Sequence, residues 1–71
     1  MHERDLLIKM GERIKMIRLK KNMTQNDLAL QCDFEKASLS RIESGLSNPT
    51  MRTLFRISKA LGVEISEFFK Y

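Results

Sequence analysis

Two cations separated by small side chains are the residues of this sequence best suited to chemistry at a surface. They are Lys36 and Arg41, within the segment EKASLSRIESG at residues 35–45. On a helix of about 3.6 residues per turn, Leu39 and Ile42 fall on one side. The opposite side carries Lys36, Ala37, Ser40, Arg41 and Ser44. A helix surface with so little bulk fits closely into a DNA major groove, where lysine and arginine bind base edges or phosphates. An ordinary solvated surface is the alternative that this segment alone leaves open.

Two short helices joined by a tight turn must position these cations. Thr24 and Asp27 have the spacing of a capping box, which predicts a helix over residues 25–32. A three-residue break follows, and a second short helix is predicted over residues 36–44. This arrangement is typical of a helix-turn-helix, here residues 25–44, in which the second helix enters the groove.

Apolar residues also recur at helical spacing before and after this motif. No sustained alternation of apolar and polar residues, which would indicate a strand, is visible. The pattern predicts a first helix that ends near Lys21 and a fourth that is capped by Thr50 and ends at Gly62. A last short helix is predicted over residues 64–69. The expected fold is therefore all-α, a five-helix bundle that forms one domain over residues 1–71.

Composition limits the classes of function. With 71 residues the core is modest and a deep catalytic cleft is not expected. One cysteine, Cys32, excludes an internal disulfide, and one histidine, His2, argues against a zinc site. No apolar run is long enough to span a bilayer and no secretory leader is visible, so we expect a cytoplasmic protein. We expect no enzyme, cofactor, metal or small-molecule substrate. A net charge of +4 and a pI near 9.6 favour a polyanionic partner.

Four motifs in register then carry a family resemblance. They are TQxxLA, SRIExG, NPT and ALGV, and the resemblance to which they belong covers about Met10 to Phe69. In order and spacing they resemble the helix-turn-helix family of phage repressors and Cro proteins, also called the XRE family. The resemblance implies a lambda-repressor-like DNA-binding domain that acts as a homodimer on a near-palindromic operator in double-stranded DNA.

The resemblance also implies roles for individual residues. Gln25 matches a glutamine that binds a phosphate or an end base, and Asn48 lies in a loop that approaches the DNA backbone. Arg18 and Glu43 match an ion pair between the first and third helices, which we interpret as structural. The DNA-binding positions implied in this way are Gln25, Lys36, Ala37, Ser38, Ser40, Arg41 and Asn48.

Four positions depart from the family pattern, and at two of them, Glu35 and Glu64, glutamate stands where the helix cap is usually serine or threonine. Asp33 stands where the family usually has glycine, in a turn that favours positive φ, which aspartate tolerates better than most residues. Ala37 occupies a base-reading position that is often polar, and alanine can only contact a thymine methyl or leave room. The sequence of the DNA half-site therefore stays open.

Apolar side chains crowd the C-terminal residues, and two interpretations apply. They can fill a small core, or they can form a homodimer seam on the last helix, which we favour because exposed apolar clusters usually mark contacts. The seam residues predicted are Ile65, Phe68, Phe69 and Tyr71.

The sequence thus predicts a transcriptional regulator in a minimal switch, either a restriction–modification controller or a Cro-like repressor. Whether it activates or represses is open, and a contact with RNA polymerase is open too, because no residues identify one. The alternative is a protein-interaction module, such as an antitoxin or adaptor, that uses the same fold with DNA binding secondary.

Overall fold

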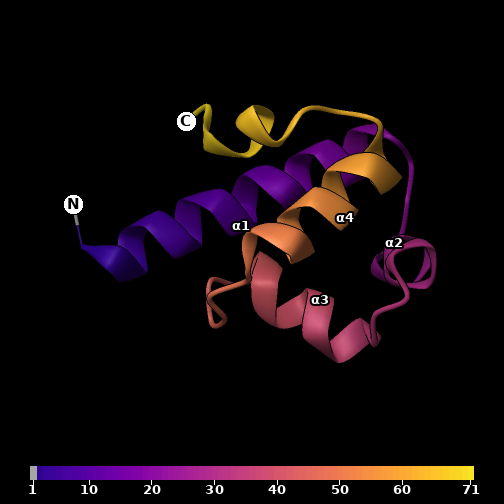
Figure 1. Cartoon of the computed structure of the whole chain (residues 1–71), viewed down its shortest axis with the longest axis horizontal. Helices are drawn as coiled ribbons and strands as arrows, with labels where there is room; N and C mark the ends of the chain where they lie inside the picture. The colour runs from indigo at the N-terminus through magenta and orange to yellow at the C-terminus, as the bar shows by residue number, and fades with distance from the viewer. Residues whose placement is uncertain (1) are drawn as a thin grey trace.

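Four α-helices and one short 3-10 helix make up the computed structural model, which describes residues 2–71 (Figure 1). The elements are α1 (Glu3–Lys20), α2 (Gln25–Cys32), α3 (Lys36–Glu43), α4 (Met51–Leu61) and η1 (Ile65–Phe69). No strand occurs in this part of the chain, so the all-α prediction is confirmed. The prediction of five helices is wrong in one respect, because the last segment is a 3-10 helix of five residues. Such tight turns are common where a segment is too short for a regular α-helix.

The predicted start and stop signals act as expected. Thr24 Oγ1 accepts a hydrogen bond from the backbone N–H of Asp27 at 3.0 Å, and Asp27 Oδ2 accepts one from the N–H of Thr24 at 2.9 Å. The bond that the Asp27 carboxylate accepts from the Thr24 backbone is the largest cause that holds the pKa of Asp27 below its usual range, and the Thr24 hydroxyl group adds to the effect. Thr50 caps α4 through the N–H of Thr53 at 3.1 Å. Asp33 adopts a φ of 58° after α2, as the turn requires.

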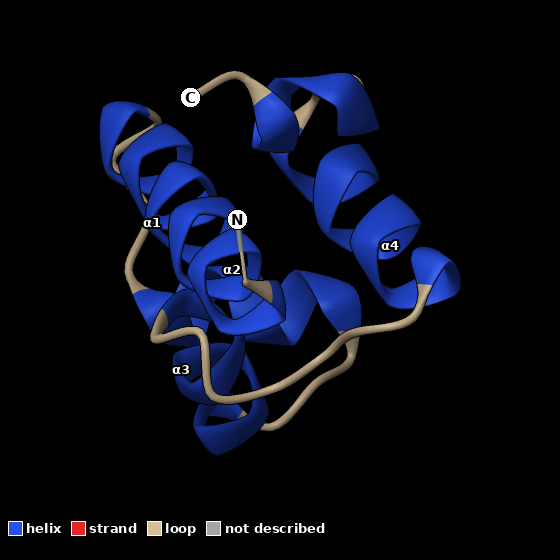
Figure 2. Cartoon of the chain, turned by 90° about the vertical axis from the view of Figure 1, so that its left-hand side faces the viewer, coloured by secondary structure: helices blue, strands red, loops and turns tan. Residues whose placement is uncertain are grey.

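The core lies between α1, α4 and the two short helices of the motif. Figure 2 shows α1 and α4 side by side, with α3 below the pair and the C-terminal segment above it. α1 packs against both α3 and η1, while α2 packs against α3 and α4. The side chains that are completely buried are Phe68, Ile14, Leu28, Leu39 and Ile57. Each helix thus contributes to one apolar cluster that holds the helix-turn-helix rigidly.

Two glycines allow α1 to approach the end of α3 at backbone distance. A Cβ atom at Gly11 would lie 2.4 Å from the carbonyl oxygen of Ile42 and 2.6 Å from that of Glu43. A Cβ atom at Gly45, which has a φ of 75°, would lie 2.7 Å from the Cα of Ile8. Any larger residue at either position would push α1 away from α3. The close approach fixes where α3 sits on the bundle.

Candidate nucleic-acid interface

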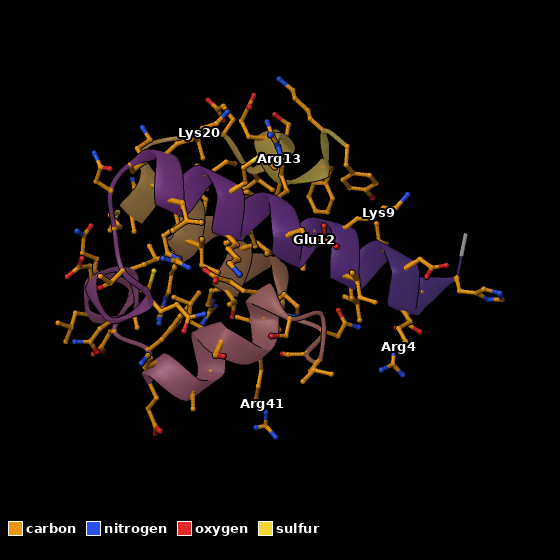
Figure 3. The ribbon with its side chains drawn as sticks, turned by 180° about the vertical axis from the view of Figure 1, so that it is seen from behind. Arg4, Lys9, Glu12, Arg13, Lys20 and Arg41 are labelled. Atoms are coloured by element: carbon orange, nitrogen blue, oxygen red, sulfur yellow. The ribbon has the colours of Figure 1, made fainter. Side chains whose placement is uncertain are left out.

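The outer surface of α3 is open, as the helical spacing predicted. Its inward residues Leu39, Ile42 and Glu43 are buried, whereas Ser40 is half-buried. The remaining residues of the outer surface are exposed: Lys36, Ala37, Ser38 and Arg41. Figure 3 shows Arg41 projecting away from the bundle, with no other element in front of it. A slim helix with exposed cations at both ends is therefore presented to solvent.

A buried ion pair anchors α3 to α1, which agrees with the structural interpretation of Arg18 and Glu43. Arg18 Nε donates to Glu43 Oε2 at 2.7 Å, and Arg18 Nη2 donates to Glu43 Oε1 at 3.1 Å. The exposed fractions of the two side chains are only 6% and 2%. Arg18 Nη1 also donates to the carbonyl oxygen of Met23 at 2.7 Å. One arginine therefore ties α1, the turn before α2, and α3 together.

Gln25 joins this network, which the sequence reasoning did not foresee. Its Nε2 donates to Glu43 Oε1 at 3.0 Å, and the residue is half-buried. One N–H of the Gln25 side-chain amide is therefore bonded within the protein. The second N–H of that amide is the side-chain donor that is left for a phosphate or a base. The DNA contact of Gln25 stays a prediction, and its role in orienting α2 against α3 is added to it.

An open groove of about 390 Å³ brings three of the predicted site residues together. Ser38, Arg41 and Asn48 line it, although Asn48 belongs to the loop that follows α3. Ser47 in the same loop and Thr50 at the start of α4 also line this groove. Hydroxyl groups, an amide and a guanidinium beside a helix N-terminus form a set of donors suited to phosphate oxygens.

Ser47 and Thr50 were not among the residues predicted for the site. The cap at Thr50 was predicted, so the sequence did carry a signal that a helix starts here. What it did not reveal is that this start lies beside Arg41 rather than elsewhere on the bundle. Lys36, Ala37 and Ser40 do not line this groove, although they belong to the same helix.

The described residues hold neither a candidate metal site nor an exposed thiol. Residues 2–71 contain no group of three or more side chains that could hold a metal ion. The one thiol, Cys32, is buried, its Sγ lies 3.8 Å from the carbonyl oxygen of Arg56, and burial raises its pKa. None of the helices is long and apolar enough to cross a membrane within this part of the chain.

The predicted seam residues divide between core and surface. The placement of Phe68 on a seam is wrong, because its side chain has 0% exposure and fills the chain's own core. Phe69 is 39% exposed and Tyr71 is 54% exposed, and Ile65 is half-buried. Phe55 on α4, which the sequence reasoning omitted, is 52% exposed and lines one groove with Ile65.

The helix-turn-helix family HTH_3 matches residues 14–68, which is most of the chain. The chain belongs to this family. The predicted XRE-like resemblance is thereby confirmed, and the arrangement of α2 and α3 is the family's helix-turn-helix.

Similar proteins within the family are named as controllers. The control protein C.BamHI of Bacillus amyloliquefaciens is 39% identical over 62 residues, covering 86% of this chain and 76% of that protein. The restriction-modification controller protein C.AhdI from Aeromonas hydrophila superposes with a TM-score of 0.87 at 27% identity, covering 89% of this chain and 96% of that one. The controller C.Esp1396I, solved as a tetramer in complex with its natural 35 base-pair operator, has a TM-score of 0.82 at 42% identity, covering 92% and 86%.

Proposed function

We propose that this helix-turn-helix protein is a transcriptional regulator that binds double-stranded DNA in a sequence-specific manner. α3 would lie in the major groove, with Lys36 and Arg41 at base edges and Ala37 and Ser40 allowing close approach. The observation that carries the proposal is the open, cationic surface of α3, held in place by the buried Arg18–Glu43 pair. The operator complex of the similar controller C.Esp1396I supports it.

The backbone of the DNA would be bound mainly at the groove between α3 and α4. Ser38, Arg41 and Asn48 lie together there, beside Ser47 and the first turn of α4. Such phosphate contacts fix the register of the protein on the duplex, and base contacts supply its sequence preference. The net charge of +4 adds affinity for DNA in general.

We infer further that the protein acts as a homodimer on a near-palindromic operator. One module of this size covers one half-site, and a two-fold axis would place a second α3 about 34 Å away. Phe55, Phe69 and Tyr71 carry exposed aromatic side chains, which are the groups best suited to a dimer seam. The controller C.Esp1396I is a tetramer on its operator, which supports self-association in this class. Among the possible kinds of regulator, a minimal switch such as a restriction–modification controller agrees best with the names of the similar proteins.

Selection of bound sequences from a pool of random duplex DNA tests this function. The expected result is a strongly enriched site with two related half-sites, separated by about one helical turn between their centres or a multiple of it. Failure to enrich any sequence, with wild-type protein that is shown to be folded, would reject the proposed function. In that case a protein-interaction role for the same fold would replace it.

A further inference from the structure

A second open groove, of about 360 Å³, lies between the first turns of α1 and the loop that follows α3. Its lining includes Glu3 and Arg4 from α1, and Gly45, Ser47 and Asn48 from the loop. Ser47 and Asn48 also line the groove that contains Arg41. The two grooves therefore adjoin at these two residues, with Arg41 on the lining of one groove and Arg4 on the lining of the other.

The first turns of α1 are fixed in this position. The backbone of Gly45 lies so close to Ile8 that a Cβ atom on the glycine would be 2.9 Å from the Ile8 backbone nitrogen. Gly11 makes a similar approach to the end of α3 one helical turn later. Because α1 is a continuous helix from Glu3, Arg4 is carried on a rigid support and not on a flexible arm.

Arg4 also points to the same side of the molecule as Arg41 of α3. In Figure 3 the side chains of Arg4 and Arg41 both project from the lower side, whereas Lys20 lies at the opposite side of the molecule. Arg4 is exposed and forms no ion pair within residues 2–71. Glu3, the nearest carboxylate in the sequence, lines the groove too, but adjacent residues of a helix do not face each other.

We propose that Arg4 binds a phosphate of the DNA backbone in the same complex in which α3 occupies the major groove. A guanidinium matches a phosphate with two parallel hydrogen bonds, and the charge remains at any usual pH. The partner is the phosphodiester backbone of duplex DNA beside each half-site. This inference rests on the proposed function and extends it, because Arg4 lies outside residues 14–68, which the family matches.

The test compares three variants on the selected operator and on an unrelated duplex, over a range of salt concentrations. Arg4→Ala should weaken binding to both duplexes by the same factor, roughly three- to tenfold, and should reduce the slope of log Kd against log salt by about 1 per protomer bound. Glu3→Gln should strengthen binding to both, since it removes a like charge from the path of the phosphates. Lys20→Ala, which removes a cation from the opposite side of α1, should leave affinity and slope unchanged.

The outcomes separate this inference from the function on which it rests. If wild-type protein binds no duplex DNA, the proposed function fails and this inference fails with it. If wild-type protein binds its operator and Arg4→Ala behaves like Lys20→Ala, only the inference is overturned. A change of base preference in Arg4→Ala would also overturn it, because a phosphate contact carries no sequence information. Thermal unfolding of Arg4→Ala should match the wild type, since its side chain is exposed.

Discussion

Arg41 is the residue whose contribution to DNA recognition is most open to test. It is exposed on α3 and also lines the groove that holds Ser38 and Asn48, so it is a candidate both for a base edge and for a phosphate. We expect Arg41→Ala to cost about 1–3 kcal/mol on the operator and to relax preference at defined base pairs. Titrations against the operator and its single-base variants measure this. An equal loss on operator and random DNA would instead make Arg41 a phosphate clamp.

Glu43 combines a buried charge with three hydrogen bonds from two other elements. Arg18 and Gln25 both donate to it, so its neutralisation leaves the arginine charge without a counter-ion in the interior. We expect Glu43→Gln to lower the free energy of unfolding by about 3–5 kcal/mol, measured by urea denaturation.

The matched control for that substitution is Glu67→Gln. Glu67 pairs with Arg13 at 3.4 Å and with Lys70, and its side chain is 31% exposed. Pairs near the surface contribute about 0–1 kcal/mol, so this change should be small. Losses of equal size in the two variants would contradict a structural role for the buried pair.

At the scale of elements, local signals in the sequence were sufficient to place the four α-helices, but they did not show that the last segment is a 3-10 helix. Thr24 and Thr50 cap α2 and α4 as predicted, and Asp33 takes the positive φ that its turn requires. These features depend on residues within a few positions of each other, so a single sequence reveals them.

Features that depend on distant residues were missed. Gln25 and Glu43 meet across 18 positions, and Ser47 and Thr50 join the site only because α4 starts beside Arg41. Phe68 was assigned to a surface because spacing within a five-residue segment cannot show which side faces a core formed by α1 and α4. Arg4 was ignored because its place depends on the close packing of Gly45 on Ile8.

The close packing of α1 against the end of α3 predicts the effect of a substitution at Gly11. In an ordinary helix Gly→Ala is stabilising by about 0.5–1 kcal/mol. At Gly11 the added Cβ would lie 2.4 Å from the carbonyl oxygen of Ile42, so Gly11→Ala should destabilise the protein by about 1–3 kcal/mol or more. It should also weaken operator binding, since α3 would be displaced.

Gly62→Ala serves as the control for that change. Gly62 has a φ of 69°, and within residues 2–71 no packed neighbour lies within 4 Å of the position that its Cβ atom would take. The substitution should cost about 1–2 kcal/mol through backbone strain alone and leave the DNA affinity of the folded protein unchanged. A Gly11→Ala protein with a raised melting temperature would show that α1 and α3 are less tightly packed than described.

At the scale of the whole molecule, the proposed dimer couples the monomer–dimer equilibrium to the affinity for DNA. Phe69 is partly exposed on η1, and a charge there should oppose burial against a second copy. We expect Phe69→Glu to shift the monomer–dimer equilibrium toward monomer at micromolar concentration and to weaken operator binding together with it. Analytical ultracentrifugation and titration of the operator measure the two effects.

Leu30→Glu is the comparison for the seam. Leu30 is 72% exposed on α2, away from the C-terminal segment, so its substitution should not alter the dimer. If Phe69→Glu leaves the dimer intact while Leu30→Glu disrupts it, the seam lies on another surface of the protein.

Methylation interference on the selected operator tests the placement of α3 in the major groove most directly. Dimethyl sulfate modifies N7 of guanine in the major groove and N3 of adenine in the minor groove, so the two grooves are read separately. We expect binding to be blocked by methylation at guanine N7 in both half-sites, and the Arg41→Ala protein to lose at least one of these positions. Interference confined to adenine N3, or absent from both half-sites, would contradict the placement of α3 in the major groove.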